Sequence, residues 1–183
     1  VTGGARRIGG AIARDLAANG WHVAVHFQES AEEAASVVKD IRADGGNAVA
    51  IQAELSLDNM PPKLINEAGN KIGPLTCLIN NASVFETDTI ETATPESWNL
   101  HLKTNLQAPF FLTQRFSEML PEGENGSVIN LLDQRVWNLT PYFASYTVSK
   151  CGLWTLTQSL ALALAPRIRV NGIGPGPALP SPR

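Results

Sequence analysis

Short runs of branched and apolar residues alternate with segments of helical periodicity along the whole chain. The runs are too short for core helices, and each is followed by a segment whose apolar residues recur every three or four positions. This alternation predicts a parallel sheet covered by helices on both faces. The predicted strands are His22–Phe27, Ala48–Ala53, Leu75–Ile79, Ser127–Leu132 and Ile168–Ile173.

The segments between these strands carry helix signals at their ends. Ser30 with Glu33 predicts a capping box, and Gly45-Gly46 predicts the end of the same helix. Thr94 followed by Pro95 is typical of a helix start, and Pro166 is expected to stop the last long helix. The helical periodicity itself covers four places: Ile8 to Leu16, Val37 to Ile41, Leu106 to Leu120, and Leu153 to Leu164.

Composition restricts the class of protein. With 44% hydrophobic and 17% charged residues, the chain is balanced like a single globular domain over residues 1–183. Its net charge of -3 argues against a nucleic-acid partner, and no apolar run approaches the roughly 20 residues of a membrane span. We expect a cytoplasmic protein. Cys77 and Cys151 have no partner cluster, so neither a disulfide framework nor a metal site is expected.

The two ends of the chain look incomplete. Val1-Thr2-Gly3-Gly4 has the character of a strand end that runs into a glycine turn, and the proline-rich stretch that closes the chain at Arg183 has the character of a loop. We therefore expect the sequence to be a fragment truncated at both ends.

The turn at Gly3 to Gly9 is a candidate phosphate site. It follows a strand end and opens an amphipathic helix, where backbone N–H groups and the helix dipole can receive a pyrophosphate. Gly3 allows a tight turn and Gly9 close packing, with Arg6, Arg7 and Ile8 between them. A plain connection between strand and helix is the alternative interpretation of such a turn.

The residues at the end of the expected strand His22–Phe27 favour NADP(H) over NAD. NAD-selective sites place an acid there for the free ribose hydroxyl, whereas this strand ends at Phe27-Gln28. Arg6 and Arg7, with the Ser30 hydroxyl and amide, would instead receive a 2′-phosphate. Glu29 argues against this interpretation because its carboxylate would repel the phosphate, and solvated surface arginines are the alternative.

Tyr146 and Lys150 are the candidate catalytic pair. They lie four residues apart at the start of a predicted helix and therefore share one face. Reduction of a carbonyl needs a proton donor, and a nearby ammonium is expected to lower the pKa of a phenol from its usual value of about 10. An isolated pair at this spacing is more often an ordinary amphipathic helix face.

The pair is accompanied by other motifs in a fixed order. These are the Thr2-Gly3 turn, Asn80-Asn81-Ala82 after the middle strand, Asn105 in the next helix, and Pro175-Gly176 after the last strand. In this set and order the chain resembles the short-chain dehydrogenase/reductase family over essentially its whole length. The resemblance implies a Rossmann-type, doubly wound α/β/α fold and an oxidoreductase.

The resemblance also implies roles for single residues. Asn81 and Ala82 match the segment beside the adenine ribose. Asn105 matches the asparagine that anchors a water near the lysine in a proton relay, and Pro175 with Gly176 matches the segment that lines the nicotinamide. A homodimer or homotetramer built from helices Pro95–Met119 and Ser145–Ala165 is likewise expected.

Two departures from the family pattern resemble its pteridine reductase branch. Asp133 stands on the strand where members usually carry a serine, and Arg7 replaces a common glycine. Ser83 and Phe85 in the run after Asn80-Asn81 also resemble that branch. A carboxyl group near Tyr146 suits a nitrogen heterocycle, and Phe85 would stack on a flat ring. Local pairing of Asp133 with Arg135 and ordinary packing of Phe85 are the alternatives.

The sequence thus predicts a reductase that transfers hydride from NADPH to a C=N or C=O substrate, with a dihydropterin or dihydrofolate-like compound favoured. Asn105, Asp133, Tyr146 and Lys150 are its expected catalytic residues. A reductase of 3-oxoacyl or other keto substrates is the second hypothesis. A protein that senses NADP(H) without turnover is the third.

Overall fold

The computed structural model describes residues 1–176, in which five strands all pair in parallel. The strands are β1 (His22–Phe27), β2 (Asn47–Gln52), β3 (Cys77–Asn80), β4 (Gly126–Leu131) and β5 (Ile168–Ile173). β1 pairs with β2, and β3, β4 and β5 form a second group in that order. Val1 and Thr2 lie between the groups, since Val1 O accepts from His26 N and Thr2 N donates to Ile79 O.

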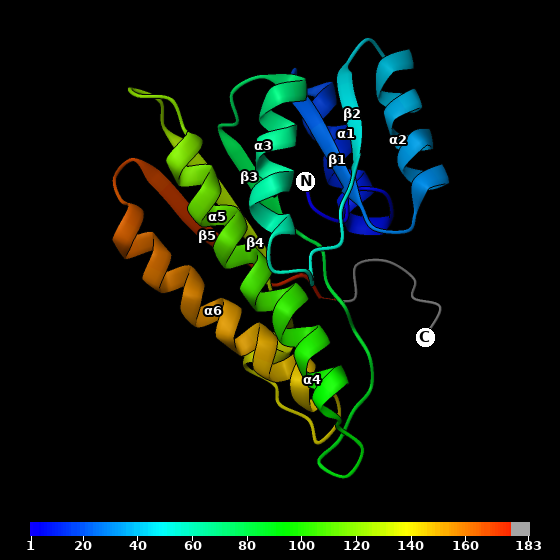
Figure 1. Ribbon diagram of the computed structural model, residues 1–183, viewed down its shortest axis with the longest axis vertical. Helices are drawn as coiled ribbons and strands as arrows, with labels where there is room; N and C mark the ends of the chain where they lie inside the picture. Colours follow the sequence, from blue (N-terminus) through cyan, green and yellow to red (C-terminus); the bar gives the residue numbers. More distant parts are fainter. Residues whose placement is uncertain (177–183) are drawn as a thin grey trace.

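Helices fill the connections between these strands (Figure 1). They are α1 (Arg7–Ala18), α2 (Ala31–Ala43), α3 (Met60–Ile72), α4 (Pro95–Leu102), α5 (Ala108–Met119) and α6 (Ala144–Leu164), with a π-helical turn η1 (Lys103–Gln107) and a 3-10 turn η2 (Gln134–Val136). The Thr94 start is confirmed by a reciprocal capping box with Ser97. The stop before Pro166 is also confirmed, because α6 ends at Leu164.

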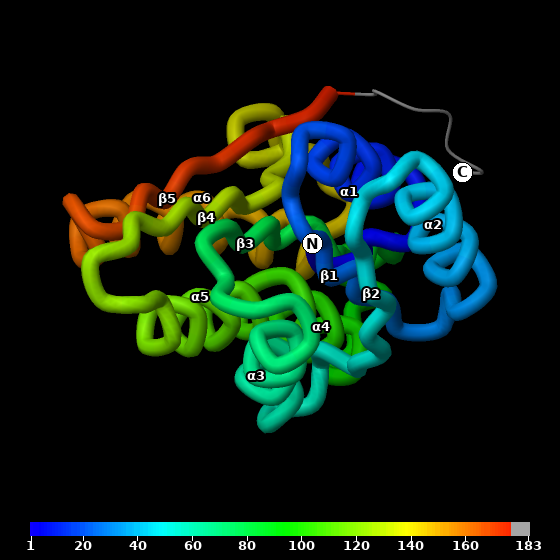
Figure 2. The backbone as a smooth tube through the Cα atoms, turned by 90° about the horizontal axis from the view of Figure 1, so that it is seen from above, coloured from blue at the N-terminus to red at the C-terminus, as the bar shows by residue number. Residues whose placement is uncertain are grey.

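Alternating side chains of β1 separate two hydrophobic cores. Val23 and Val25 belong to the core formed with α1 and α2, whereas Ala24 packs against the core that contains residues of α3 and α5. Leu160 and Leu164 of α6 pack against that second core as well. Figure 2 shows α1 on the opposite side of the strands from α3 and α5. The predicted three-layer, doubly wound α/β/α architecture is confirmed.

The structure differs from the sequence analysis at three places. The Ser30 side chain makes no capping hydrogen bond, so the predicted capping box is wrong. Helix α3 was not predicted, because its apolar stripe is short and two prolines stand in its first turn. The expected helix from Pro95 to Met119 is helical throughout, but its middle part η1 is a π-helical turn. Pro109 has no N–H to continue the ladder at that point, which favours a local change of helix type.

All five strands end at one edge of the fold, and the segments that follow them hold the candidate site residues. The glycine turn follows Val1 and Thr2, Gln28 follows β1, Asn81 follows β3, and Asp133 follows β4. Ligands of open α/β sheets bind at this edge. The proline-rich tail beyond Gly176 lies outside the described residues. Within residues 1–176, no helix combines the length and apolarity required to traverse a bilayer.

Candidate active site

A cleft of about 640 Å³ runs along this edge of the strands. Its volume is in the usual range for a small-molecule or cofactor site. The residues that sequence analysis placed at the site and that line the cleft are Gly3, Arg6, Arg7, Ile8, Gly9, Phe27, Gln28, Ser30, Asn81, Ala82, Ser83, Phe85, Asp133, Tyr146, Lys150, Pro175 and Gly176. Asn105 does not belong to the lining.

The glycine turn is tightly packed at Gly3 and Gly9. Gly3 adopts a positive φ of 59°, and a Cβ on Gly9 would lie 2.1 Å from the carbonyl oxygen of Gly3. α1 begins at Arg7 directly behind this turn, so its first N–H groups face the cleft. The combination leaves bare backbone donors at a helix N-terminus, which suits a phosphate group.

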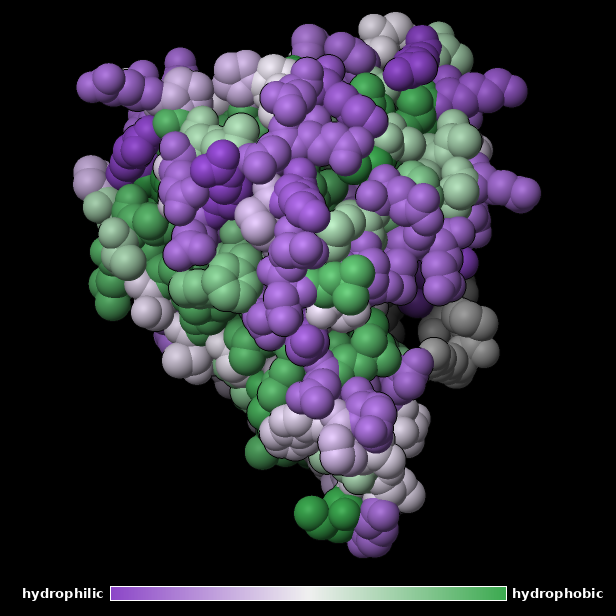
Figure 3. All heavy atoms as spheres, viewed as in Figure 1, coloured by the Kyte–Doolittle hydropathy of each residue, from purple (hydrophilic) through white to green (hydrophobic). Residues whose placement is uncertain are grey.

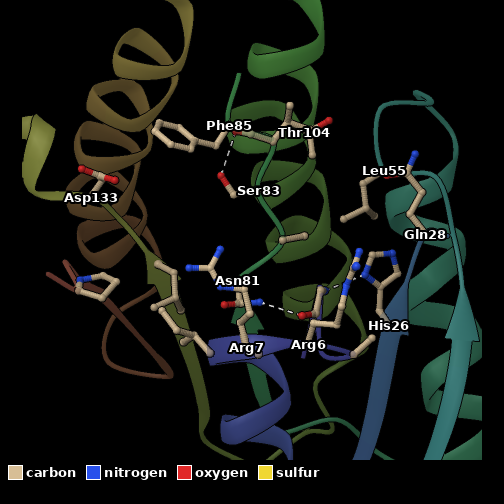
Figure 4. Close-up of a pocket in the computed structure, with 18 of the residues that line it drawn as sticks. Arg6, Arg7, His26, Gln28, Leu55, Asn81, Ser83, Phe85, Thr104 and Asp133 are labelled. Carbon is tan, nitrogen blue, oxygen red and sulfur yellow. Dashed lines mark hydrogen bonds between the residues drawn. The ribbon is translucent and has the colours of Figure 1, made fainter. Parts of the chain in front are cut away.

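Asn81 and Thr2 brace the turn from beneath. The Asn81 amide donates to Thr2 O at 2.8 Å and to Gly3 O at 3.1 Å. The Thr2 hydroxyl oxygen accepts from the backbone N–H of Asn81 and of Ala82, each at 2.9 Å. Figure 4 shows Asn81 beside the turn in the lower part of the cleft. The end of β3 thereby fixes the position of the candidate phosphate site.

His26 also positions the turn, a role that sequence analysis missed. Its Nδ1 accepts from Gly3 N–H at 3.0 Å and its Nε2 donates to Ala53 O at 3.1 Å. Burial lowers the pKa of His26 to about 4, so the ring is neutral at pH 7. The signal that could have identified His26 is its position near the end of β1, directly before Phe27-Gln28, where the cofactor preference was predicted. It lines the cleft, although no histidine of the sequence stands in a ligand-like group.

Basic and acidic groups share the mouth of the cleft. Arg6, Arg7, Glu29 and Ser30 all line it. Arg6 forms a 3.4 Å ion pair with Glu33, but both side chains are about half exposed and such a pair is weak. Figure 4 shows Arg7 beside Asn81 and Arg6 beside His26. Two guanidinium groups are thus available to an anionic ligand, with one carboxylate near them.

Tyr146 and Asp133 meet at the other end of the cleft. The Tyr146 hydroxyl donates to Asp133 Oδ2 at 2.8 Å. Asp133 Oδ1 accepts from the backbone N–H of Arg135 at 2.8 Å and lies 3.5 Å from its guanidinium. Local pairing with Arg135 and contact with Tyr146 therefore occur together. One carboxylate orients the phenol while its own position is fixed by the turn η2.

The electrostatics of Tyr146 differ from the expected ones. Burial, followed by the charge and hydrogen bond of Asp133, raises the pKa of the phenol above its ordinary value. The prediction that the pKa of Tyr146 is lowered is therefore wrong. Lys150 Nζ donates to Leu131 O at 2.8 Å and lies 5.8 Å from the centre of the tyrosine ring. The phenol is held in its protonated, proton-donating form at neutral pH.

Lys150 itself is a buried cation. Its residue is 3% exposed, and burial lowers the pKa of the ammonium to about 8, although Asp133 opposes this shift. At pH 7 the group still carries its charge. An ammonium at this depth can stabilise negative charge that develops on Tyr146 when the phenol gives up its proton.

Asn105 holds the loop after β3 and lies behind the cleft. Its Oδ1 accepts from Val84 N at 2.8 Å, and its Nδ2 donates to Val84 O at 2.9 Å and to Ser149 Oγ at 3.1 Å. Its side chain thus bridges the loop that carries Ser83 and Phe85 to helix α6. The expected water-anchoring role stays a prediction. The Phe85 ring stacks on Phe143, with centroids 4.6 Å apart.

Several lining residues gave no signal to sequence analysis. Ala53 and Leu55 follow β2 and close the cleft near the glycine turn. The rule that sites form at the carboxyl ends of strands would have found both. Thr104 enters through the π-helical turn, whose presence the periodicity did not indicate. Arg135 was expected only as a possible partner of Asp133, but its guanidinium also stacks on the rings of Phe85 and Phe143.

The part of the chain that the structure covers contains no set of side chains suited to binding a metal ion. No group of three or more His, Cys, Asp or Glu side chains among residues 1–176 could hold a metal ion. Cys77 and Cys151 are both free thiols.

A glycine turn at a helix N-terminus, parallel strands, and a tyrosine and lysine four residues apart define a nucleotide-binding α/β oxidoreductase. The chain belongs to the short chain dehydrogenase family, whose sequence profile matches residues 1–181. It is 34% identical over 177 residues to the 3-oxoacyl-[acyl-carrier-protein] reductase FabG of Staphylococcus aureus. The matched region covers 96% of this chain and 72% of that protein.

Solved structures of similar proteins include complexes with NADP. FolM alternative dihydrofolate reductase 1 from Brucella suis, in complex with NADP, is 47% identical with a TM-score of 0.94, covering 98% of this chain and 74% of that one. A short chain dehydrogenase from Burkholderia cenocepacia, also in complex with NADP, is 35% identical with a TM-score of 0.91, covering 96% and 72%. These similarities support the predicted family and its pteridine reductase-like branch.

Proposed function

We propose that this protein is an NADPH-dependent reductase of a dihydropterin or dihydrofolate-like C=N substrate. The observation that carries the proposal is the hydrogen bond from Tyr146 to Asp133 in a cleft that continues to the glycine turn. A ketone needs one proton donor, whereas a ring with N–H groups and an imine also uses a carboxyl group. The similarity to FolM of Brucella suis supports the same substrate class.

The residues of the cleft fit NADP(H). The bare turn at Gly3 and Gly9 suits the pyrophosphate, and the guanidinium groups of Arg6 and Arg7 suit a 2′-phosphate. Pro175 and Gly176 would line the nicotinamide at the far end. When bound, NADPH supplies the hydride that reduces the ring carbon. The complexes of two similar proteins with NADP support this choice.

The protein itself supplies the proton. Tyr146 is protonated at neutral pH, since its pKa lies above the ordinary value of a phenol, and its O–H would donate to the ring nitrogen. Lys150 stabilises the phenolate that remains, and Asp133 accepts hydrogen bonds from ring N–H groups. Hydride on carbon and a proton on nitrogen convert the C=N bond to a CH–NH unit, and the oxidised cofactor leaves.

Reduction of a 3-oxoacyl thioester is the second candidate function. The similarity to FabG favours it, because that protein is a 3-oxoacyl-[acyl-carrier-protein] reductase. In this case Tyr146 would donate to the ketone oxygen, and Asp133 would be a substitute for the usual serine. A non-catalytic NADP(H) sensor is the third, and the intact Tyr146 and Lys150 argue against it.

A substrate panel separates these three functions. NADPH oxidation is measured with dihydrobiopterin, dihydrofolate and a 3-oxoacyl thioester, and NADPH binding is measured in parallel by fluorescence. We expect kcat/KM for a dihydropterin to exceed that for the thioester at least tenfold. A preference for the thioester would establish the second function, and binding without turnover would establish a sensor.

We further propose that copies of the chain assemble into a homodimer or homotetramer. Phe110 on α5 and Leu162 on α6 are 37% and 85% exposed. Figure 3 shows hydrophobic residues over the α5 and α6 region of the molecule. Apolar faces of this kind are typical of subunit interfaces. Sedimentation of the wild type and of Leu162→Asp tests this assembly, since a charge at the interface should shift the protein toward the monomer.

A further inference from the structure

A cluster of buried polar residues lies beside Tyr146 and outside the cleft lining. Asp88 is 2% exposed, and His101 and Ser145 are fully buried. The three come from different parts of the fold: the loop after β3, helix α4 and the first turn of α6. We refer to Asp88, His101 and Ser145 as the buried triad. The reduction chemistry described above uses none of them directly.

Asp88 caps helix α6 from a distant part of the chain. The residue before this helix, Phe143, has a positive φ of 63° and makes no side-chain cap. Asp88 O accepts from Ala144 N at 3.1 Å, and Asp88 Oδ1 accepts from Ser145 N at 3.1 Å. The Ser145 hydroxyl donates to Oδ2 of the same carboxylate. The first two N–H groups of α6 are therefore satisfied by one residue of the substrate-side loop.

His101 extends this contact in a defined direction. Its Nε2 accepts from the backbone N–H of Glu86 at 3.1 Å, so the proton of the neutral ring is on Nδ1. That Nδ1 lies 2.7 Å from Ser145 Oγ and 3.0 Å from Ser97 O. The donors thus run from His101 to Ser145 and from Ser145 to Asp88. Each polar atom of the triad has a partner, which makes the arrangement specific rather than adaptable.

The buried triad connects Tyr146 to the loop that carries Ser83 and Phe85, and both would face a substrate. Ser145 precedes Tyr146 in the chain, and the His101 ring lies edge-on to the Tyr146 ring at 6.0 Å. On the other side, Asp88 and Glu86 belong to the loop that carries Ser83 and Phe85. The Phe85 ring contacts Tyr146 edge-on at 4.7 Å. A shift of this loop is therefore transmitted to the tyrosine backbone through Asp88.

The charge of Asp88 fits a fixed cap. Burial by itself would raise the pKa of this carboxyl, but the hydrogen bonds from Ser145 and Ser97 outweigh it and hold the pKa below its ordinary value. Asp88 is thus ionised at neutral pH. An anion at the N-terminus of a 21-residue helix also interacts favourably with the helix dipole.

We infer that Asp88 is a positioning residue for the reduction, which anchors the first turn of α6 and thereby holds the Tyr146 hydroxyl in register with the loop that carries Ser83 and Phe85. This inference rests on the proposed role of Tyr146 as proton donor. Misplacement by about 1 Å can lower a rate a hundredfold even when the chemical groups are intact. Asp88 should consequently affect kcat much more than cofactor binding.

The test compares Asp88→Ala and Asp88→Asn with Glu91→Ala in the full chain. Glu91 is an exposed acid of the same loop, whose carboxylate accepts from Thr89 Oγ1 at 2.6 Å. We expect kcat for dihydrobiopterin to fall tenfold or more in Asp88→Ala and less in Asp88→Asn, which keeps an acceptor for Ser145 N. The Kd for NADPH should stay within twofold in both, and Glu91→Ala should match the wild type.

Hydrogen exchange supplies a readout that does not depend on turnover. The amides of residues 144–147 should exchange faster in Asp88→Ala than in the wild type, and Glu91→Ala should leave them unchanged. A folded Asp88→Ala protein with wild-type kcat would overturn the inference. An equal loss of kcat and bound NADPH, in proportion to the unfolded fraction, would also overturn it.

Two further outcomes are distinguishable. Where Asp88→Ala does not fold, Ser145→Ala removes one donor to Asp88 and should lower kcat severalfold at unchanged Kd; wild-type kcat in that variant would count against the inference. A wild type that reduces only the 3-oxoacyl thioester would refute the proposed substrate class. The same variants measured on the thioester would then decide the role of Asp88 separately.

Discussion

The Tyr146 hydroxyl and the Asp133 carboxylate are joined by a hydrogen bond of 2.8 Å. The first residue lies in the first turn of α6 and the second follows β4, so the fold brings them together across thirteen positions of sequence. Burial and the neighbouring carboxylate both raise the pKa of this phenol, which stays protonated at neutral pH. The contact gives the site a proton donor and an acceptor side by side, which is the arrangement that a nitrogen heterocycle requires.

Replacing Asp133 should separate the two substrate classes. Asp133→Asn keeps the size of the side chain but removes its charge, and we expect kcat for dihydrobiopterin to fall about a hundredfold, in the range of a lost general acid–base group. Asp133→Ser should lower the dihydrobiopterin rate similarly while it improves the relative rate on a 3-oxoacyl thioester. Asp58→Asn serves as control, since Asp58 is exposed and pairs with Lys103 at 3.2 Å. Equal dihydrobiopterin rates in all four proteins would refute a role for Asp133.

Removal of the phenol hydroxyl should stop turnover. In Tyr146→Phe the ring packing against Phe85 is preserved and the proton donor is lost, so we expect kcat to fall at least a hundredfold. NADPH affinity, measured by fluorescence titration, should change less than twofold. The other tyrosine of the chain, Tyr142, is 57% exposed, and Tyr142→Phe is the matched control. Full activity of Tyr146→Phe would rule out the proposed mechanism.

The pH dependence should report the buried ammonium. Burial lowers the pKa of Lys150 to about 8, so the cation is present below this pH and is lost as pH rises through it. Since kcat/KM reports ionisations of the free enzyme, we expect kcat/KM to fall above pH 8, with a slope that approaches a tenfold loss for each pH unit. Asp133 raises the Lys150 pKa, and Asp133→Asn should therefore move the break to lower pH. A flat profile up to pH 10 would show that the Lys150 charge is not needed.

The sequence predicted the strands well because their signal is local. His22–Phe27 and Ile168–Ile173 agree with the structure at both ends, since branched residues and flanking turns mark them. Helix α3 was missed, because Pro61 and Pro62 read as a loop although they occupy its first turn. The turn η1 depends on how α4 and α5 pack around Pro109. The hydrophobic periodicity of the sequence does not indicate such packing.

The site was predicted where motifs have a fixed spacing and was incomplete where the tertiary structure selects the partners. Gly9, Tyr146 and Lys150 lie in the cleft as expected. The direction of the Tyr146 pKa shift was wrong, because it depends on burial and on the charge and hydrogen bond of Asp133. Asp88 gave no signal at all, since its capping contact with Ser145 joins residues 57 positions apart.

The glycine turn allows a sharp test of the candidate phosphate site, because two adjacent glycines of α1 have opposite requirements. A Cβ on Gly9 would lie 2.1 Å from Gly3 O and 2.5 Å from Asn81 Nδ2, whereas a Cβ on Gly10 would meet Arg14 at 3.3 Å through a flexible side chain. Gly9→Ala should therefore displace the backbone that would receive the pyrophosphate. We expect NADPH affinity to fall more than tenfold in this variant. Gly10→Ala should retain the affinity and gain up to about 1 kcal/mol of helix stability.

Thermal unfolding with and without NADPH measures both effects at once. A ligand that binds only the folded state raises the unfolding free energy by about 2.7 kcal/mol at a concentration of 100 Kd. Wild type and Gly10→Ala should show this gain, and Gly9→Ala should lose most of it. Because each variant is measured with and without NADPH, a loss of stability of α1 itself is separated from a loss of NADPH stabilisation. Equal NADPH stabilisation of the two variants would therefore place the pyrophosphate elsewhere than over Gly3 and Gly9.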